Sequence, residues 1–163
     1  MPKNALDEMD LRLLQTVQEH ARLSNVELAE QVGLSASPCL RRMRQLEESG
    51  VIKGYMTLID QNAVGLPVSV FISVTLKEQS EPALEGFESR IRALPEVMEC
   101  YLMTGAADYL LRVVTADLAA YERFLKEHLT RIPVIASIQS SFALKQVSFR
   151  TALPLPHIVH GKR

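Results

Sequence analysis

Apolar residues recur every three or four positions through the first third of the chain, the period of a helix packed on one side. The first run begins after Asp7, a residue suited to cap a helix, and extends to about His20. A second, short run begins at Ser24 and has Glu27 three residues later, the spacing of a capping box. The expected core positions of these two helices are Met9, Leu13, Leu14, Val17, Ala21, Val26, Leu28, Ala29 and Val32.

A third helix is predicted over residues 35–48, beyond a turn at Gly33. Ser35 and Ser37 are candidate N-caps, and Pro38 suits the first turn. Its expected buried face holds Cys39, Leu40, Met43 and Leu46, and its polar face holds Ser37, Pro38, Arg41 and Gln45, flanked by Arg42 and Arg44. A DNA major groove accepts such a helix. A solvated helix whose arginines pair with Glu47 and Glu48 fits this segment equally well.

The order of helix, short helix, glycine-containing turn and helix is typical of a helix-turn-helix. After Gly50, a candidate helix C-cap, residues 51–59 predict a small hairpin, or wing, around Gly54. Lys53 in this wing is a candidate phosphate contact. A three-helix unit can also serve as a dimerisation module. The capping box, the turn glycine and the arginines opposite an apolar stripe would then be coincidental, so DNA binding is favoured.

Beyond residue 67 the pattern changes to strict alternation, which predicts a strand from Val68 to Leu76. A helix from about Pro82, strands over 97–104 and 108–114, a helix capped by Asp117, and a strand over 134–147 follow. The order βαββαβ predicts a ferredoxin-like antiparallel sheet with helices on one face. Its open face is expected to be apolar and covered by a second copy. The expected inward positions of the two helices are Leu84, Phe87, Ile91, Leu94, Leu118, Tyr121, Leu125, Leu129 and Ile132.

The predicted fold class is therefore α+β, with four segments along the chain. They are a winged helix-turn-helix domain (1–59), a linker rich in turn formers (60–67), a ferredoxin-like ligand-binding and oligomerisation domain (68–147) and a C-terminal arm (148–163). The arm is expected to be extended and to pack on a partner. His157 and His160 lack nearby carboxylate or thiol partners, which favours a solvated tail over a metal site.

The composition narrows the class of protein. Hydrophobic and charged fractions of 47% and 23% are those of a soluble globular protein. No apolar run approaches the ~20 residues of a membrane helix, and the N-terminus lacks a signal-peptide core, so a cytoplasmic protein with reduced cysteines at Cys39 and Cys100 is expected. The net charge of −1 means that DNA affinity must come from local cations and from several copies acting together.

Several motifs, in this order, resemble the Lrp/AsnC family of leucine-responsive, or feast/famine, regulators. They are Leu6-Asp7 with Asp10, Ser24–Ala29, Val32–Ser35, Ser37–Arg42 with Leu46-Glu47, Gly50–Tyr55 and Gly105–Leu110. The resemblance spans roughly Leu6 to Val147. It implies a transcription regulator that binds double-stranded DNA, dimerises through its sheets and often assembles as four dimers, an octamer. It also implies a free amino acid as the effector, and Ser37-Pro38-Cys39 places the chain near the leucine-responsive branch.

The same resemblance implies the residues that meet DNA. The helix that reads DNA would be Ser35 to Glu48. The protein itself would be cytoplasmic and associated with the nucleoid. Arg41, Arg42 and Gln45 are expected at base edges or flanking phosphates, and Arg44 and Lys53 at phosphates. The full set of candidate DNA contacts is Ser35, Ser37, Pro38, Arg41, Arg42, Arg44, Gln45 and Lys53.

The resemblance also places an effector site at a hairpin turn, with Tyr101, Met103, Thr104, Gly105, Ala106, Ala107 and Asp108. Asp108 could pair with a ligand ammonium, and N–H groups of the glycine turn could hold its carboxylate. The alternative is that Gly105 and Asp108 only form the turn, which their residue types also favour. Since Ala106 and Ala107 are small and neutral, a small apolar amino acid such as leucine or methionine is expected rather than lysine.

Three functions follow from these patterns: an amino-acid-responsive regulator, an architectural DNA-packaging protein, and an enzyme or metabolic sensor. The near-zero net charge argues against packaging by charge alone. The sequence has no nucleophile–base pairing, metal-ligand cluster or glycine-rich phosphate loop, so no catalytic residue, metal or cofactor is expected. The favoured hypothesis is the amino-acid-responsive regulator.

Overall fold

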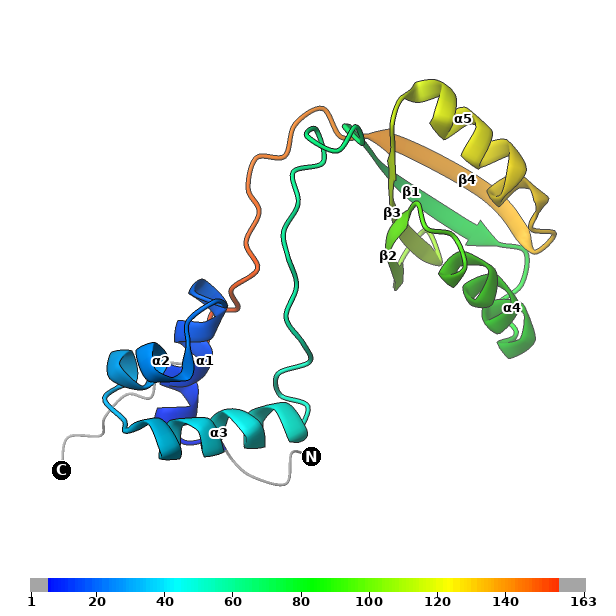
Figure 1. The fold of residues 1–163 in the computed structure, drawn as a ribbon. Helices are drawn as coiled ribbons and strands as arrows, with labels where there is room; N and C mark the ends of the chain where they lie inside the picture. The colour runs from blue at the N-terminus through cyan, green and yellow to red at the C-terminus, as the bar shows by residue number, and fades with distance from the viewer. Residues whose placement is uncertain (1–5, 156–163) are drawn as a thin grey trace. The chain divides into compact units, whose positions relative to one another are not determined.

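The computed structural model describes residues 6–155, which form two compact units (Figure 1). The first contains residues 6–57 and 148–155, and the second contains Leu58–Val147. The helices of the first unit are α1 (Glu8–Glu19), α2 (Asn25–Val32) and α3 (Ala36–Glu48). The elements of the second are β1 (Val68–Leu76), α4 (Glu81–Arg92), β2 (Val97–Leu102), β3 (Tyr109–Thr115), α5 (Leu118–Glu127), the 3₁₀ helix η1 (Leu129–Arg131) and β4 (Ile135–Phe142). His157 and His160 lie outside the described residues.

Local side-chain caps position the helices of the first unit. At α2 the predicted capping box is present, because Ser24 Oγ accepts from Glu27 N (3.3 Å) and Glu27 Oε2 accepts from Ser24 N (2.7 Å). The α1 terminus has a second box between Asp7 and Asp10, which the sequence analysis missed. Gly33 ends α2 with a φ of +75°, a conformation that favours glycine, so the turn into α3 is sharp.

The three helices share one core, formed by Leu13, Leu14, Leu28, Ala29, Val32, Cys39, Met43 and Leu46. Three predicted core residues neither belong to this core nor pack against it. Ala21 is exposed, because α1 ends at Glu19 and Ala21 lies beyond it. Val26 is 57% exposed, because it lies about 200° around α2 from Leu28. Leu40 is 39% exposed, because the buried side of α3 is narrower than its sequence suggested and consists of Cys39, Met43 and Leu46.

The predicted hairpin over residues 51–59 is not formed in this structure, since the segment contains no strand. Gly50, directly after the C-cap residue Ser49 of α3, has a φ of +76°, and Ile52 N donates to Leu46 O (3.0 Å). Tyr55 then donates its hydroxyl to Glu47 Oε1 (2.8 Å). Burial, and then the adjacent Glu47 carboxylate, raise the pKa of Tyr55 to about 12. A two-stranded ribbon without further packing is only marginally stable, which explains the absence of the hairpin.

The second unit has the predicted ferredoxin-like order. Its antiparallel strands lie in the order β2-β3-β1-β4. Alternation in β1 places Val70, Ile72 and Val74 inward with no exposed surface. They pack with Phe87 and Ile91 of α4 and with other inward residues, namely Leu76, Tyr109, Leu111, Val113, Tyr121, Phe124, Leu129 and Ile132. The two helices therefore cover one face of the sheet, as Figure 1 shows.

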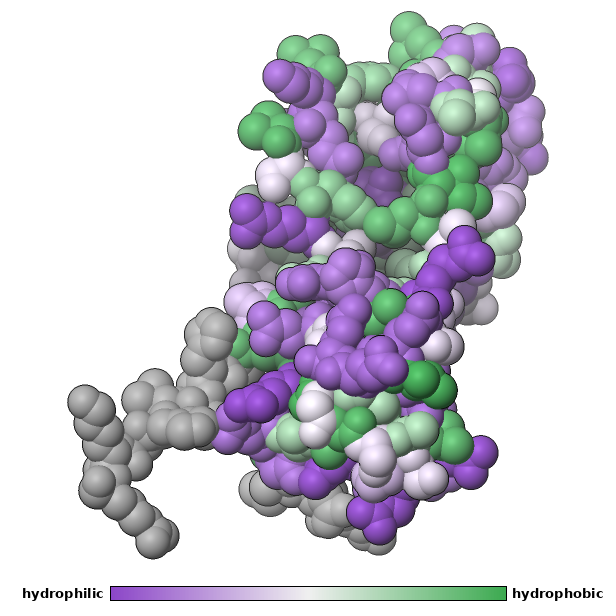
Figure 2. All heavy atoms as spheres, turned by 60° about the vertical axis from the view of Figure 1, so that its left-hand side comes forward, coloured by the Kyte–Doolittle hydropathy of each residue, from purple (hydrophilic) through white to green (hydrophobic). Residues whose placement is uncertain are grey.

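The open face of the sheet is more polar than predicted. The outward positions of β1 are Ser69, Phe71, Ser73 and Thr75, and those of β4 opposite them are Ser137, Gln139 and Ser141. Phe71 and Tyr101 are exposed by 39% and 53%. On the side of the molecule that Figure 2 draws, hydrophobic and hydrophilic residues are interspersed. The expectation of a predominantly apolar open face is wrong for β1 and β4, because hydroxyl side chains alternate with the buried aliphatic ones.

Three further expectations about the second unit needed correction. Leu118, predicted to face inward, is 64% exposed. It directly follows Asp117, whose carboxylate caps α5 by accepting from Ala120 N (2.6 Å). The last helix ends at Glu127, and a 3₁₀ turn continues the chain. The final strand ends at Phe142 rather than near residue 147.

Residues 148–155, the described part of the predicted arm, belong to the first unit. They contain no helix or strand. Gln18 of α1 holds both main-chain groups of Leu153: its Oε1 accepts from Leu153 N (2.7 Å) and its Nε2 donates to Leu153 O (3.3 Å). Leu155 packs against the helical core. The arm therefore contacts the helix-turn-helix of its own chain.

Gln18→Ala is expected to loosen this contact without unfolding the unit. Because the amide loses its acceptor, hydrogen exchange at Leu153 N should speed up about fivefold, the equivalent of one net hydrogen bond. Gln15→Ala is the matched control, because Gln15 lies on the same helix and forms no side-chain hydrogen bond to the described part of the arm. Unchanged exchange at Leu153 in Gln18→Ala would show that the arm is not held by this side chain.

Candidate nucleic-acid interface and effector region

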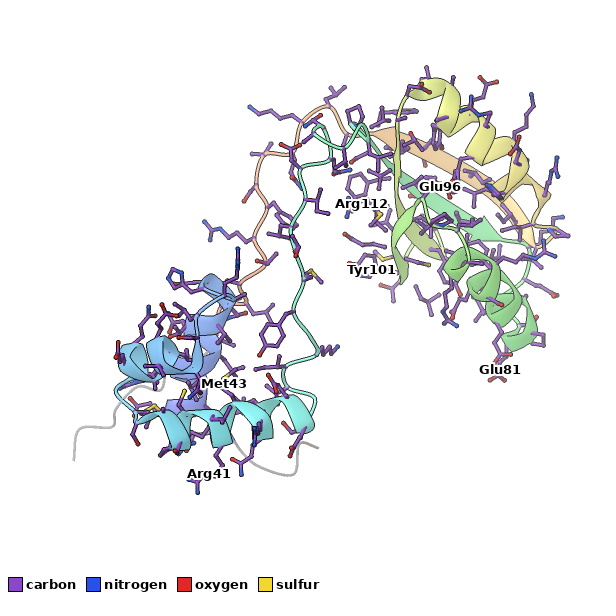
Figure 3. All side chains as sticks on the ribbon, viewed as in Figure 1. Arg41, Met43, Glu81, Glu96, Tyr101 and Arg112 are labelled. Atoms are coloured by element: carbon purple, nitrogen blue, oxygen red, sulfur yellow. The ribbon has the colours of Figure 1, made fainter. Side chains whose placement is uncertain are left out.

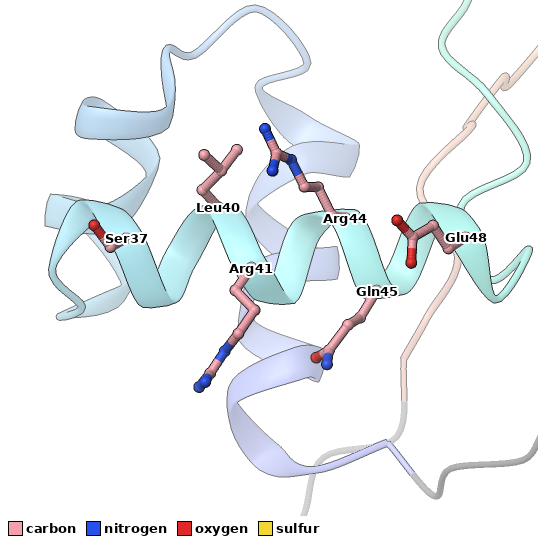
Figure 4. A pocket seen from close by; sticks show the side chains of 6 residues that line it. All are labelled: Ser37, Leu40, Arg41, Arg44, Gln45 and Glu48. Carbon is pink, nitrogen blue, oxygen red and sulfur yellow. The ribbon is translucent and has the colours of Figure 1, made fainter.

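The exposed side of α3 carries a stripe of six side chains that line a shallow hollow (Figure 4). They are Ser37, Leu40, Arg41, Arg44, Gln45 and Glu48. Their spacing of three and four residues places them on one side of the helix. In Figure 4, Leu40 and Arg44 lie on one side of this stripe, and Arg41 and Gln45 lie on the other. Figure 3 shows Arg41 extending away from the helix on the side opposite Met43.

The stripe is free to bind an external partner. Within residues 6–155, no ion pair or side-chain hydrogen bond engages Arg41, Arg44 or Gln45. Two unpaired guanidiniums and an amide thus face solvent beside a single carboxylate, that of Glu48. Guanidinium and amide groups are the side chains that pair with purine edges and phosphates.

Arg42, predicted among the DNA contacts, lies elsewhere. Its Nη1 donates to Asp7 Oδ2 (2.7 Å) and to Asp10 Oδ1 (2.8 Å), and its side chain is 28% exposed. These contacts join α3 to the capping box of α1. The hydrogen bond from Asp10 N and the Arg42 guanidinium hold the pKa of Asp7 below its ordinary value. Arg42 therefore holds α3 against the start of α1. Sequence spacing alone could not distinguish this role from DNA contact.

The remaining candidates lie around the helix ends. Ser35 occupies the N-cap position of α3 but makes no side-chain cap bond, and Pro38 is partly buried in the first turn. The start of α3 is tied to α2 instead, because Asn25 Nδ2 donates to Ala36 O (2.8 Å). Lys53 is exposed beyond the C-terminal end of α3.

The predicted effector residues gather at the β2–β3 turn. Met103 N donates to Asp108 O (2.8 Å), which closes the turn, and Gly105 at its tip has a φ of +124°. Tyr101, Met103, Thr104, Gly105 and Ala106 are exposed. None of the hydrogen bonds among the described residues uses the N–H groups of Gly105, Ala106 and Ala107. These donors are consequently available to an anion.

Asp108 is 8% exposed, and both of its carboxylate oxygens are occupied. Oδ2 accepts from Leu76 N (2.7 Å) and Oδ1 accepts from Gln79 Nε2 (2.6 Å). Asp108 N also donates to Val74 O (2.9 Å). Asp108 therefore ties the turn to the end of β1, and its buried carboxylate already accepts two hydrogen bonds. Its pairing with a ligand ammonium stays a prediction. The Gln79 partner was missed, because 29 residues separate it from Asp108.

Two negative findings apply to the part of the chain that is described. No group of three or more His, Cys, Asp or Glu side chains is arranged to hold a metal ion in residues 6–155. Among the described helices, none is long and apolar enough to span a membrane.

Two family models match the chain. Residues 6–53 match a winged helix-turn-helix DNA-binding domain, and residues 69–153 match the Lrp/AsnC ligand-binding domain. The Bkd operon transcriptional regulator of Pseudomonas aeruginosa is 50% identical over 150 residues, covering 92% of this chain and 98% of the relative. The leucine-responsive regulatory protein of Rhizobium meliloti is 41% identical over 142 residues, covering 87% and 91%.

Solved structures agree with this assignment. A transcriptional regulator from Neisseria meningitidis in complex with L-Met has a TM-score of 0.90 and 41% identity, covering 95% of this chain and all of that one. Escherichia coli AsnC has a TM-score of 0.82 and 25% identity, covering 91% and 98%. The matched families are regulators rather than enzymes. The chain is therefore a DNA-binding transcriptional regulator that belongs to the Lrp/AsnC family, with a helix-turn-helix domain and a ligand-binding domain.

Proposed function

We propose that this regulator prefers particular DNA sequences and reads them with the stripe on α3. The observation that carries the proposal is the set of unpaired donors on one side of α3, above all Arg41, Arg44 and Gln45. Arg41 and Gln45 project together and contact base edges, and Arg44 contacts a base edge or a phosphate. Four further residues lie at or beyond the ends of the stripe and contact the phosphate backbone of the DNA, namely Ser35, Ser37, Pro38 and Lys53. Arg42 instead holds α3 against α1.

The proposed effector is a small apolar amino acid such as leucine or methionine, bound at the β2–β3 turn. The free N–H groups at Gly105, Ala106 and Ala107 suit its carboxylate. The exposed side chains of Tyr101 and Met103 suit an apolar side chain. The L-Met complex of the Neisseria regulator supports this ligand class.

The protein would work as a homodimer that assembles further, to an octamer, in the cytoplasm and associated with the nucleoid. One monomer presents a single short cationic stripe on a chain of net charge −1, so several copies are needed for firm binding. The effector would change the assembly or the placement of the α3 helices, and with it DNA affinity.

Selection of DNA from a random-sequence duplex pool, followed by gel shifts at low salt, tests the DNA proposal. Related sequences should be enriched, and unrelated duplexes should bind more weakly. Even binding to all duplexes would favour DNA packaging and would contradict the proposal.

Thermal unfolding with each standard amino acid tests the effector proposal, because a ligand bound only by the folded protein raises the melting temperature. Leucine or methionine should raise it, and lysine should not. Gly105→Ala should abolish the rise, since its φ of +124° disfavours a side chain. Gly65→Ala, at another positive-φ position (+78°) outside the turn, should retain it. A rise that persists in Gly105→Ala would place the ligand elsewhere.

A further inference from the structure

Leu40 is an apolar side chain in the middle of the polar stripe on α3. It lies between Ser37, one turn before it, and Arg44, one turn after it, and it lines the same hollow as Arg41. Its side chain points the same way as that of Arg44 (Figure 4). With 39% of its surface exposed, it presents an aliphatic side chain among the unpaired polar groups of the stripe.

Leu40 is not one of the residues that hold α3 in the core of the first unit. Cys39, Met43 and Leu46 form the buried side of α3 with 0%, 8% and 4% exposure. Leu40 belongs neither to that core nor to the partly buried residues that pack against it. Any helix-forming polar residue would serve at this position if α3 only had to be held against α1 and α2. A contact with the partner of α3 would account for a leucine here.

The chemistry of the major groove identifies such a contact. Its base edges present hydrogen-bond donors and acceptors, and thymine adds an apolar group, the C5 methyl. Guanidinium and amide groups on the stripe match the polar edges, whereas an aliphatic side chain matches only the methyl. We infer that Leu40 packs against the C5 methyl of a thymine and selects thymine at that position, an inference that rests on the proposed DNA-reading role of α3.

Replacing thymine by uracil tests this contact, because uracil pairs identically and lacks only the methyl group. The probe is the duplex that the full-length wild-type protein enriches most strongly from the random pool, with each thymine replaced by uracil in turn. At one position or more, wild-type affinity should fall roughly fourfold, the effect of losing one buried methyl group. Leu40→Ala should bind thymine and uracil at that position equally.

Val51→Ala is the matched control, since Val51 is exposed to a similar extent (37%) but lies outside the hollow. Val51→Ala should lose as much affinity as the wild type when thymine is replaced by uracil. Leu40→Ile should show part of this loss, whereas Leu40→Ala should show none. Unfolding curves for Leu40→Ala should match the wild type, which excludes misfolding. A wild type that is indifferent to every uracil, or a Leu40→Ala chain that keeps the response, overturns the inference while sequence-preferring binding stands. A pool without any enrichment overturns the proposed function and the inference together.

Discussion

Arg41→Ala should weaken binding to the selected DNA by about tenfold to a hundredfold, the discrimination that one bidentate arginine contact provides. Arg41 extends from the exposed side of α3 and has no ion-pair partner among the described residues. Its loss should therefore cost affinity without costing stability, since surface substitutions usually change the free energy of unfolding by less than about 0.5 kcal/mol. Binding constants from gel shifts, with selected and unrelated duplexes at the same salt concentration, give the measurement.

The comparison of duplexes separates two roles for Arg41. If it reads a base, the loss should be large on the selected duplex and small on unrelated ones, and preference at one base pair should relax. An equal loss on both duplexes would make it a phosphate contact. Arg123→Ala is the matched control, because Arg123 is an exposed arginine of the second unit and its removal changes the net charge identically. Wild-type binding by Arg41→Ala would contradict the assigned reading role.

Arg42→Ala should lower the stability of the protein, whereas Arg41→Ala should lower its DNA affinity. Its guanidinium donates to Asp7 and Asp10 at 2.7 and 2.8 Å, and its removal leaves two carboxylates facing each other at the start of α1. We expect a loss of about 1 to 2 kcal/mol in the free energy of unfolding, the lower part of the range for charged hydrogen bonds, because the half-exposed Asp7 is screened by water. Denaturant unfolding followed by circular dichroism measures it.

Two further stability measurements check this role of Arg42: combined substitutions of its partners, and unfolding at low pH. Arg42→Ala should cost less in a chain that also carries Asp7→Asn and Asp10→Asn, whereas Arg44→Ala should cost nothing in either background. Because the folded-state pKa of Asp7 lies below its ordinary value, this carboxylate stabilises the fold at neutral pH. Its contribution is lost as the pH falls through that lowered value, so the difference between wild type and Arg42→Ala should shrink there. An Arg42→Ala chain of wild-type stability that loses DNA binding would restore Arg42 to the reading surface.

Much of the fold was determined by short-range sequence. The Ser24–Glu27 capping box, the cap at Asp117 and the alternation of β1 are each encoded within a few residues, and the structure confirms all three. The order βαββαβ followed from such local signals. The candidate DNA-binding helix and the turn at Gly105 were also visible in the sequence, though their residue-level roles stay predictions.

Tertiary structure decided what periodicity could not. Arg41 and Arg42 are adjacent and chemically identical, yet one faces solvent and the other pairs with Asp7 and Asp10, more than 30 residues away in sequence. In the same way, the partners of Asp108 and the contact of Gln18 with Leu153, 135 residues apart, depend on the path of the chain. Leu40 is exposed because Cys39, Met43 and Leu46 already form the buried side of α3. Capping and alternation are properties of neighbouring residues and can be read from sequence, whereas these contacts exist only once distant segments have packed.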